Sequence, residues 1–373
     1  KSVKISKLGK VAVVAAVSTA LALPTFTTAT AASKFATATS ASQVGGLAGL
    51  ANECRKEGQL NVIALPHDWA DYGSIIEKFK SKYGVKVDEA NPDAGSQEEI
   101  DTANRLKGTS RSPDVFDIGY PTAGTYPGTG IFSPYKVRTW NVNYLAQALS
   151  HSEITPAYTG LLTIGYDASL GNITKLDDLL KPVFKGKVAI NGDPLVSTTA
   201  LNSVFMVNLA LGGNFDDVAP AVAWFKKLNS VGNFINVKPS VATYASGQTP
   251  VVMDNMYNQV TIQKKMKEIG KVWKVFTPAV LGSTYNIAIS AWAPHPACAR
   301  LWTEFIASEE VAAIYASAGA TPAIWPYLVK TRRAPAAGIA VVGKTKVSAP
   351  QSTTAQSAKA REYLKANWSA AVG

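Results

Sequence analysis

Short apolar runs and amphipathic stretches alternate along the chain from about residue 60 onwards. Residues 60–65 form an apolar run between a glycine and a proline, which is typical of a buried strand. Residues 72–83 carry apolar side chains at helical spacing up to Gly84, and this pattern predicts an amphipathic helix. Residues 85–89 and 115–119 predict two more strands. Strands that alternate with helices indicate an α/β fold with a mostly parallel sheet.

The alternation is interrupted between residues 120 and 159, which are rich in Pro, Gly, Tyr and Trp, and it then resumes. The tail at 330–357 is rich in Ala, Pro and Lys, so we expect a surface segment there. A closing helix at 358–371 is expected to dock through Tyr363, Leu364 and Trp368. The other predicted elements are strands at 161–166, 188–191, 251–253, 272–276 and 287–290, and helices at 176–180, 199–211, 218–228, 296–308 and 309–317.

The first 32 residues have the pattern of an export signal. Four lysines at positions 1, 4, 7 and 10 precede an apolar stretch at 11–26 and small residues at 29–31. A membrane anchor is the alternative, but the stretch is shorter than the roughly 20 residues that a spanning helix needs, and Pro24 interrupts it. We therefore predict cleavage near residue 32 and a secreted, periplasmic or envelope-associated protein. The residues before Cys54 do not fit a lipoprotein cleavage site.

Composition and charge narrow the function. The chain has 373 residues and a formal net charge of +11. Four of the lysines lie in the predicted signal, which leaves 11 − 4 = +7 on the remaining chain. These charges are scattered, without an arginine-rich run, so a nucleic-acid partner is not expected. About 340 residues are enough for two domains with their own cores.

The chain has two cysteines, Cys54 and Cys298. Both fall in predicted helices, at 47–57 and 296–308. An oxidising compartment favours one long-range disulfide between them, which would require these two helices to meet in the same lobe. Two separate buried thiols are the alternative.

Several short blocks in a fixed order give the chain a family resemblance. The blocks are Gly-Gln-Leu-Asn-Val at 58–62, Lys-Tyr-Gly-Val-Lys-Val at 82–87, Ser-Pro-Asp-Val-Phe-Asp at 112–117, Phe-Lys-Gly-Lys-Val at 184–188, Ala-Ser-Gly-Gln-Thr-Pro-Val-Val at 245–252 and Ala-Pro-His-Pro at 293–296, followed by Leu-Trp-Thr-Glu-Phe at 301–305. In this order they resemble the family 1 extracellular solute-binding proteins, in the branch of polyamine, ferric-ion and aminophosphonate receptors, over about residues 57–305.

The resemblance implies an α/β, two-lobed type II periplasmic-binding-protein fold with two crossover strands, expected near 161–166 and 285–289. It places residues 33–162 plus 287–330 in lobe 1 and residues 163–286 plus 331–373 in lobe 2. It also implies that a small-molecule solute binds in the cleft and is handed to the membrane permease of an ABC importer. We expect a monomer without a cofactor or a resident metal.

Ligands in such folds meet the loops after strands and the N-termini of helices. Asp68 and Trp69 follow the first strand and could pair with and stack on an amine. Helix capping by the aspartate and packing of the tryptophan are the alternatives. Ser96, in Ser-Gln-Glu-Glu, is expected to cap the following helix in a capping box, so its hydroxyl is not expected to bind a ligand.

A second candidate lies at the start of the predicted helix at 199–211. Asp193, Ser197 and Thr198 precede this helix, and hydroxyls with free backbone N–H groups can hold a carboxylate or phosphonate. Ordinary helix capping by one of the hydroxyls is the alternative.

The third candidate is the main one. Asp254 ends a predicted strand, Tyr257 follows it, and Tyr285 precedes the returning strand. We expect Asp254 to hold a cationic group, with the two tyrosines and Trp69 as aromatic walls. A ferric-ion site built from tyrosines is an alternative, which the methionine before Tyr257 weakens because Fe(III) prefers several hard oxygens.

An enzyme finds little support in the motifs. The three histidines form no paired metal motif, and there is no Gly-x-Ser-x-Gly or glycine-rich phosphate loop. Ser133-Pro134-Tyr135-Lys136 matches Ser-x-x-Lys without its usual companion motifs. The sequence therefore predicts a receptor for a small polar solute that bears an amine, such as a polyamine or aminophosphonate, with a secreted hydrolase as the alternative of another class.

Overall fold

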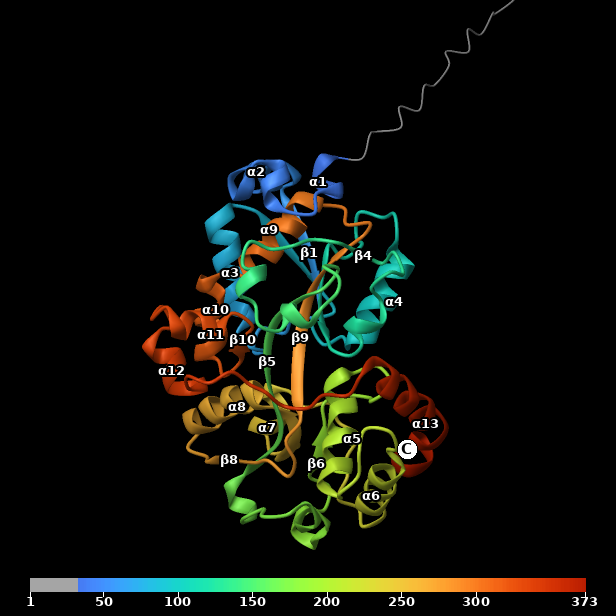
Figure 1. Ribbon diagram of the computed structural model, residues 1–373. Coiled ribbons are helices and arrows are strands. Elements are labelled where there is room, and N and C mark those ends of the chain that lie inside the picture. The colour runs from blue at the N-terminus through green and yellow to red at the C-terminus, as the bar shows by residue number, and fades with distance from the viewer. Residues whose placement is uncertain (1–32) are drawn as a thin grey trace, which may run out of the picture. The chain divides into compact units, whose positions relative to one another are not determined.

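The structure is a computed structural model that describes residues 33–373. The predicted export signal lies outside the described residues. Residues 34–373 form one compact unit. Inside this unit the buried apolar side chains form two large cores, one around Phe79 and Trp302 and the other around Phe205 and Phe225. We call the elements around these cores the first and the second lobe (Figure 1).

The first lobe is built from a small parallel sheet and the helices that flank it. β1 pairs with β2 in parallel, and β3 pairs with residues 285–289 of β9 in the antiparallel sense. Its elements are α1 Lys34–Thr37, α2 Gly46–Glu57, β1 Gln59–Ile63, α3 Tyr72–Tyr83, β2 Lys86–Ala90, α4 Ser96–Leu106, β3 Val115–Gly119, β4 Phe132–Ser133, α9 Pro296–Ile306, α10 Glu309–Ser317, β10 Thr321–Pro322, α11 Trp325–Lys330 and α12 Ala336–Val342.

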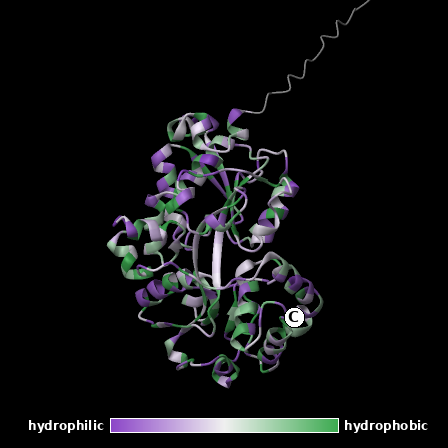
Figure 2. Ribbon diagram, in the orientation of Figure 1, coloured by the Kyte–Doolittle hydropathy of each residue, from purple (hydrophilic) through white to green (hydrophobic). Residues whose placement is uncertain are grey.

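The second lobe surrounds the apolar helix α5. In Figure 2 this helix is among the most hydrophobic parts of the lobe, and eleven of its thirteen residues are buried. The elements are β6 Val188–Ile190, α5 Thr198–Ala210, α6 Ala219–Ser230, α7 Val241–Ala245, β7 Val251–Asn255, α8 Met256–Glu268, β8 Trp273–Phe276 and α13 Thr354–Val372, with short 3-10 helices such as Leu176–Leu180 in the connections.

Two long strands run through both lobes. β5 Thr155–Asp167 pairs with β9 Gly282–Ser290 over Thr155 to Leu161, and then continues to pair with β7 and β8. Figure 1 shows both strands running between the two groups of elements. The predicted lobe boundaries at 162/163 and 286/287 fall inside these strands.

The expectation of a mostly parallel sheet is wrong. Only β1 with β2 and β6 with β7 are parallel among the strand pairs of the described residues. β5 leads away from the first lobe and β9 leads back, so they run in opposite directions and pair in the antiparallel sense with each other and with β3, β4, β7, β8 and β10. The sequence pattern shows where strands lie but not which strands become neighbours.

Several local predictions need correction. Gly95, not Ser96, is the N-cap of α4, and the Glu98 side chain accepts a hydrogen bond from the Gly95 N–H. The Ser96 hydroxyl instead accepts from the Gly119 N–H and ties α4 to β3. The sequence analysis also missed α8, which begins directly after β7.

The C-terminal tail is more structured than expected. α11 and α12 pack on α10 of the first lobe around Trp325. α13 packs on α6 of the second lobe, where the rings of Trp368 and Phe225 lie 5.1 Å apart. Leu364 and Trp368 are buried as expected, whereas Tyr363 is exposed because it lies on the outer face of α13.

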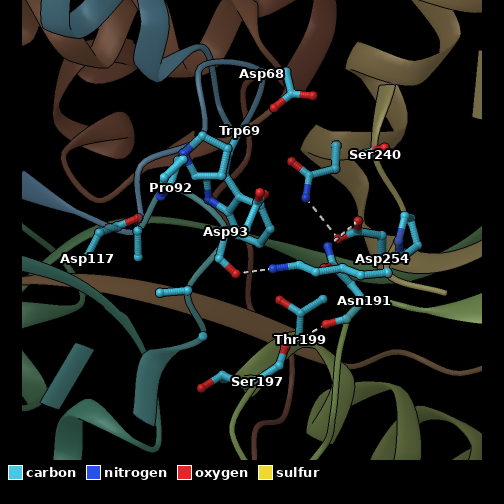
Figure 3. Close-up of a pocket in the computed structure, with 18 of the residues that line it drawn as sticks. Asp68, Trp69, Pro92, Asp93, Asp117, Asn191, Ser197, Thr199, Ser240 and Asp254 are labelled. Carbon is cyan, nitrogen blue, oxygen red and sulfur yellow. Dashed lines mark hydrogen bonds between the residues drawn. The ribbon is translucent and has the colours of Figure 1, made fainter. Parts of the chain in front are cut away.

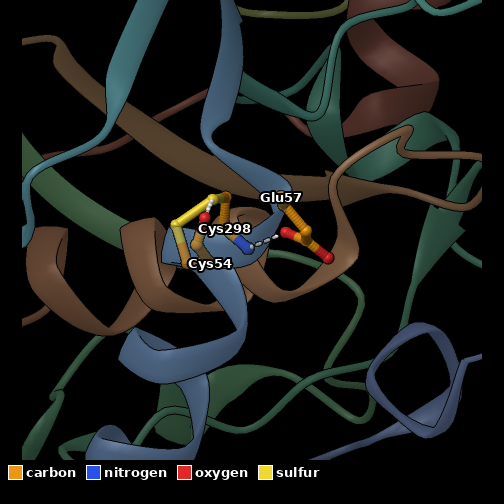
Figure 4. Close-up of side chains that lie close together, drawn as sticks. All are labelled: Cys54, Glu57 and Cys298. Atoms are coloured by element: carbon orange, nitrogen blue, oxygen red, sulfur yellow. Dashed lines mark hydrogen bonds between the residues drawn. A yellow bond between two sulfur atoms is a disulfide. The ribbon is translucent and has the colours of Figure 1, made fainter.

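The predicted disulfide is confirmed. Cys54 of α2 and Cys298 of α9 are bonded across a separation of 244 residues (Figure 4). Glu57, at the end of α2, accepts hydrogen bonds from the backbone N–H groups of Ala297 and Cys298 in the first turn of α9. A covalent bond and a carboxylate cap therefore hold these two helices together. Among the described residues, no helix is long and apolar enough to cross a membrane.

Candidate functional site

A pocket of about 840 Å³, including its open mouth, lies where elements of both lobes meet around the crossover strands (Figure 3). Its walls come from the loops after β1, β2 and β6, from the N-terminal ends of α4 and α5, and from β3, β7 and α8. Its polar and aromatic lining residues include Asp68, Trp69, Asp93, Ser96, Glu99, Asp117, Asn191, Ser197, Thr198, Thr199, Lys238, Tyr244, Asp254, Asn258 and Tyr285.

Asp254 lines the pocket, as the cleft hypothesis requires. Its Oδ1 accepts from the Asn255 N–H at 2.7 Å and from Asn258 Nδ2 at 2.9 Å, and its Oδ2 accepts from Asn191 Nδ2 at 2.8 Å. Burial raises the pKa of this carboxyl to about 6, although the three donors favour its charged form. A carboxylate offers about four acceptor positions, so one remains for a solute.

Trp69 forms an aromatic wall of the pocket. Its ring meets those of Tyr257 and Tyr285 edge-on, at centroid distances of 5.4 Å and 5.2 Å. Its indole Nε1 donates to the hydroxyl of Tyr158. Tyr285 lines the pocket next to it and stacks on Tyr158. The tryptophan is therefore held by two neighbouring rings and by one hydrogen bond, so a solute meets a fixed surface.

Tyr257 does not line the pocket, which corrects its predicted position. It is the second residue of α8, it is fully buried, and its ring packs edge-on against that of Trp69. Its hydroxyl has no partner among the described residues. Tyr257 can thus support Trp69 but does not reach a solute in this arrangement.

Two acidic side chains that the sequence analysis did not propose line the opposite wall. Asp117 is the middle residue of β3, and Glu99 lies in the first turn of α4. Glu99 Oε2 accepts from the Asp117 N–H at 3.0 Å. Burial raises the pKa of Asp117 to about 7 and raises that of Glu99 well above its usual range. Asp117 is an acidic residue within the otherwise apolar run 115–119, and this feature of the sequence could have identified it as a candidate.

The hydroxyls at the start of α5 line the pocket but are already paired. Ser197 Oγ caps the helix by accepting from the Ala200 N–H, and it donates to the Asn191 carbonyl. Thr198 pairs with Thr122 Oγ1 at 3.0 Å, and Thr199 pairs with the Tyr285 hydroxyl at 3.0 Å. This arrangement is what the capping alternative predicted.

Asp193 does not line the pocket. Its side chain accepts from the Leu195 N–H in the exposed turn before α5, so it shapes that turn. Asp68 does line the pocket, beside Tyr244. The pKa of Tyr244 is raised, mainly by burial of its hydroxyl and to a smaller extent by the negative charge of Asp68.

The lining is strongly acidic. Five carboxyl groups line it, against one cationic side chain, Lys238. The Lys238 ammonium already donates to the Asp93 carbonyl across the pocket. Acidic groups therefore outnumber cationic ones in the lining, and a positively charged guest suits it better than a negatively charged one.

Contacts across the mouth bring the two lobes together. The Gln97 N–H, in α4 of the first lobe, donates to the Val196 carbonyl before α5 at 3.1 Å. Asp93 with Lys238 and Thr122 with Thr198 form two more contacts between the lobes. The described arrangement is thus a closed one.

The histidines do not line the pocket, and neither does Ser133, which lies in β4. The only group of possible metal ligands among residues 33–373 is Cys54, Glu57 and Cys298, and its two cysteines are joined to each other.

Two lobes on crossing strands, closed around a polar pocket, define a binding protein of the two-lobed type II class. A family model described as bacterial extracellular solute-binding protein matches residues 110–338, more than half of the chain. The chain belongs to this family, which places it outside the cytoplasm as the solute-binding component of a transporter.

Solved structures confirm the fold. A putative spermidine/putrescine ABC transporter from Listeria monocytogenes is 15% identical with a TM-score of 0.60, over 83% of this chain and 99% of that one. A periplasmic thiamin binding protein is 15% identical with a TM-score of 0.59, over 84% and 96%. Iron-bound HitA from Pseudomonas aeruginosa is 19% identical with a TM-score of 0.58, over 83% and 98%. A search of curated proteins finds no match.

Proposed function

We propose that this protein captures a small amine-bearing solute and hands it to the membrane permease of an ABC importer. The observation that carries this proposal is the position of Asp254, a buried carboxyl at the pocket wall with one acceptor position to spare. An ammonium group can donate a hydrogen bond to this carboxylate, and its positive charge offsets the cost of burying the negative one.

The acidic lining and the aromatic wall support the same class of guest. Trp69 presents an indole beside the acids, and a ring face attracts a cation. The ferric-ion alternative finds less support, because Tyr244 and Tyr285 are the only tyrosines of residues 33–373 that line the pocket. Burial raises the pKa of both, and this opposes the phenolate form that Fe(III) needs.

A thermal-shift screen of amines, followed by calorimetry, tests this function. We expect the protein to bind an amine, and Asp254→Asn to weaken that binding about 10- to 100-fold, because a charged hydrogen bond is lost. Asp193→Asn makes the same chemical change outside the pocket and serves as the control. A wild-type protein that binds no amine, or an equal effect of both variants, would refute the proposal.

A further inference from the structure

The end of α8 and the turn that follows it concentrate positive charge on the surface of the second lobe. Residues 264–274 contain five lysines and one glutamate, a formal charge of 5 − 1 = +4. This is more than half of the +7 that the chain carries from residue 33 onwards, so its charge is not evenly scattered. All five side chains are exposed, namely Lys264, Lys265, Lys267, Lys271 and Lys274. We call residues 264–274 the α8 turn.

Little of this charge is neutralised within the protein. Lys265 lies 3.5 Å from Glu268, and Lys271 lies 3.7 Å from Asp167. Both pairs are long and involve exposed lysines, and such pairs bind weakly in water. The other three lysines of the α8 turn form no ion pair with any described residue. The turn therefore presents its positive charge to the solvent.

Two apolar side chains of the same turn are also exposed. Val272 is 62% exposed and Ile269 is 51% exposed, and they are two of the three most exposed large hydrophobic residues that the structure describes. Gly270 between them reverses the chain with a φ of 73°. Met266 before the turn and Trp273 after it are buried in the same apolar cluster. The backbone is thus anchored from the inside, and both apolar side chains stay on the outside.

An anionic lipid bilayer matches both features. Its phosphate headgroups attract lysines, and the boundary between headgroups and acyl chains accepts apolar side chains that project from a basic surface. Protein interfaces are poor in lysine and rich in arginine and exposed aromatic residues. The α8 turn has no arginine, and its one aromatic residue, Trp273, is buried. Its chemistry therefore favours lipid over a protein partner.

We propose that the α8 turn docks the protein on an anionic phospholipid bilayer, with its lysines at the headgroups and Ile269 and Val272 inserted between them. This surface is distinct from the solute pocket, and the inference does not depend on the proposed function. In Figure 1, α8 and β8 lie at one side of the second lobe, and α6 and α13 lie at the other.

Sedimentation with lipid vesicles tests the docking. The protein is a chain that begins at residue 33, because residues 34–373 form one compact unit and the predicted export signal would itself bind lipid. One set of vesicles is phosphatidylcholine with about one quarter phosphatidylglycerol, and the other is phosphatidylcholine alone. We expect at least about 10-fold tighter binding to the anionic vesicles, and release as sodium chloride rises from about 0.05 M to about 0.5 M. Protein that stays in the supernatant with both sets of vesicles overturns the proposal.

Two variants separate the contributions of charge and apolar insertion. Changing Lys265, Lys267 and Lys271 to glutamine should weaken binding to the anionic vesicles about 30- to 300-fold. Ile269→Ser combined with Val272→Ser should weaken it about 3- to 10-fold while keeping the charge. All five side chains are exposed, so both variants should keep the wild-type melting temperature.

The matched control removes the same charge from the other side of the lobe. Lys226 and Lys227 of α6 and Lys365 of α13 are exposed, and changing all three to glutamine should leave most of the binding intact. An equal loss in this control and in the lysine variant of the α8 turn would show that net charge alone draws the protein to lipid, and would overturn the proposal. Wild-type affinity of the double serine variant would overturn it as well, because the apolar side chains would then not enter the bilayer.

Discussion

The indole Nε1 of Trp69 lies 2.8 Å from the hydroxyl oxygen of Tyr158 and donates a hydrogen bond to it. The same hydroxyl donates to Asp117 Oδ2 at 2.7 Å. One tyrosine on a crossover strand therefore links the aromatic wall of the pocket to the buried carboxyl beside it. Hydrogen bonds that follow one another in this way polarise each other, so the loss of the Tyr158 hydroxyl affects both Trp69 and Asp117.

Tyr158→Phe should destabilise the protein while leaving the ring packing in place. The Trp69 N–H and the Asp117 carboxyl would each lose a partner, so we expect the free energy of unfolding to fall by about 1–3 kcal/mol. Chemical denaturation of the solute-free protein measures this change. Tyr315→Phe is the matched control, because its hydroxyl bonds Tyr72 and does not contact the tryptophan. Unchanged stability of Tyr158→Phe would mean that the chain of bonds contributes nothing.

Stability and affinity should depend on pH in opposite directions. The pKa values of Asp254 and Asp117 are raised to about 6 and about 7 in the folded protein. An acid with a raised folded-state pKa stabilises the fold at low pH, and this contribution is lost as pH rises through 6 to 7. Binding of an amine at Asp254 needs the charged carboxylate, so affinity should rise over the same interval.

Melting temperatures at pH 5, 6, 7 and 8, with and without 1,4-diaminobutane, check this prediction. Among the described residues, Lys238 is the cationic side chain of the pocket lining, and its ammonium bonds the Asp93 carbonyl. The titratable groups that act on Asp117 are Glu99 and five tyrosines, Tyr72, Tyr158, Tyr257, Tyr285 and Tyr315. Those that act on Asp254 are Asp68, Tyr244, Tyr257 and Tyr285. The double variant with both aspartates changed to asparagine should show a flatter profile. A solute-induced shift that is largest at pH 5 would contradict the prediction.

The disulfide should matter for stability and not for recognition. Cys54 and Cys298 close a loop across 244 residues, and neither lines the pocket. Replacing both with alanine should lower the free energy of unfolding by about 2–5 kcal/mol, because the unfolded chain gains freedom. Denaturation with and without reductant gives the value, and reductant should have no effect on the variant. A large loss of solute affinity in the folded variant would show that α2 and α9 also shape the pocket.

Elements with strong local signals could be predicted from the sequence. The helix Tyr72–Tyr83 and the strand Val115–Gly119 have the bounds that the apolar spacing and the glycine stop predicted. The disulfide was also predicted, since both cysteines lie in amphipathic helices of an exported chain. Asp254 and Trp69 were placed at the pocket because they follow strands, where clefts form in α/β folds.

What the sequence did not show depends on neighbours that are distant along the chain. Asp117 lies in an apolar strand, and only the passage of β5 beside it brings Tyr158 to its carboxyl. Tyr257 was misplaced because a helix begins directly after Asn255, so three residues after Asp254 the chain faces the other way. The sequence pattern gave no sign of that change of direction.

Thr122 should help to hold the lobes closed. Its Oγ1 accepts from Arg361 Nη2 of α13 at 2.8 Å and pairs with Thr198 Oγ1 at 3.0 Å. It therefore joins the first lobe to two elements of the second. Arg361 is largely buried, and its Nε lacks a partner among the described residues, so it depends on this contact.

Thr122→Val keeps the shape of the side chain and removes both hydrogen bonds. A ligand that binds the closed state loses affinity when that state is less populated, so we expect 1,4-diaminobutane to dissociate about 3- to 10-fold faster. Stopped-flow tryptophan fluorescence measures the rate, and small-angle scattering should show a larger radius of gyration without solute. Thr125→Val is the matched control, because its hydroxyl bonds the Pro121 carbonyl within the first lobe. Equal dissociation rates for the two variants would show that closure does not depend on Thr122, and that the pocket contacts alone hold the lobes together.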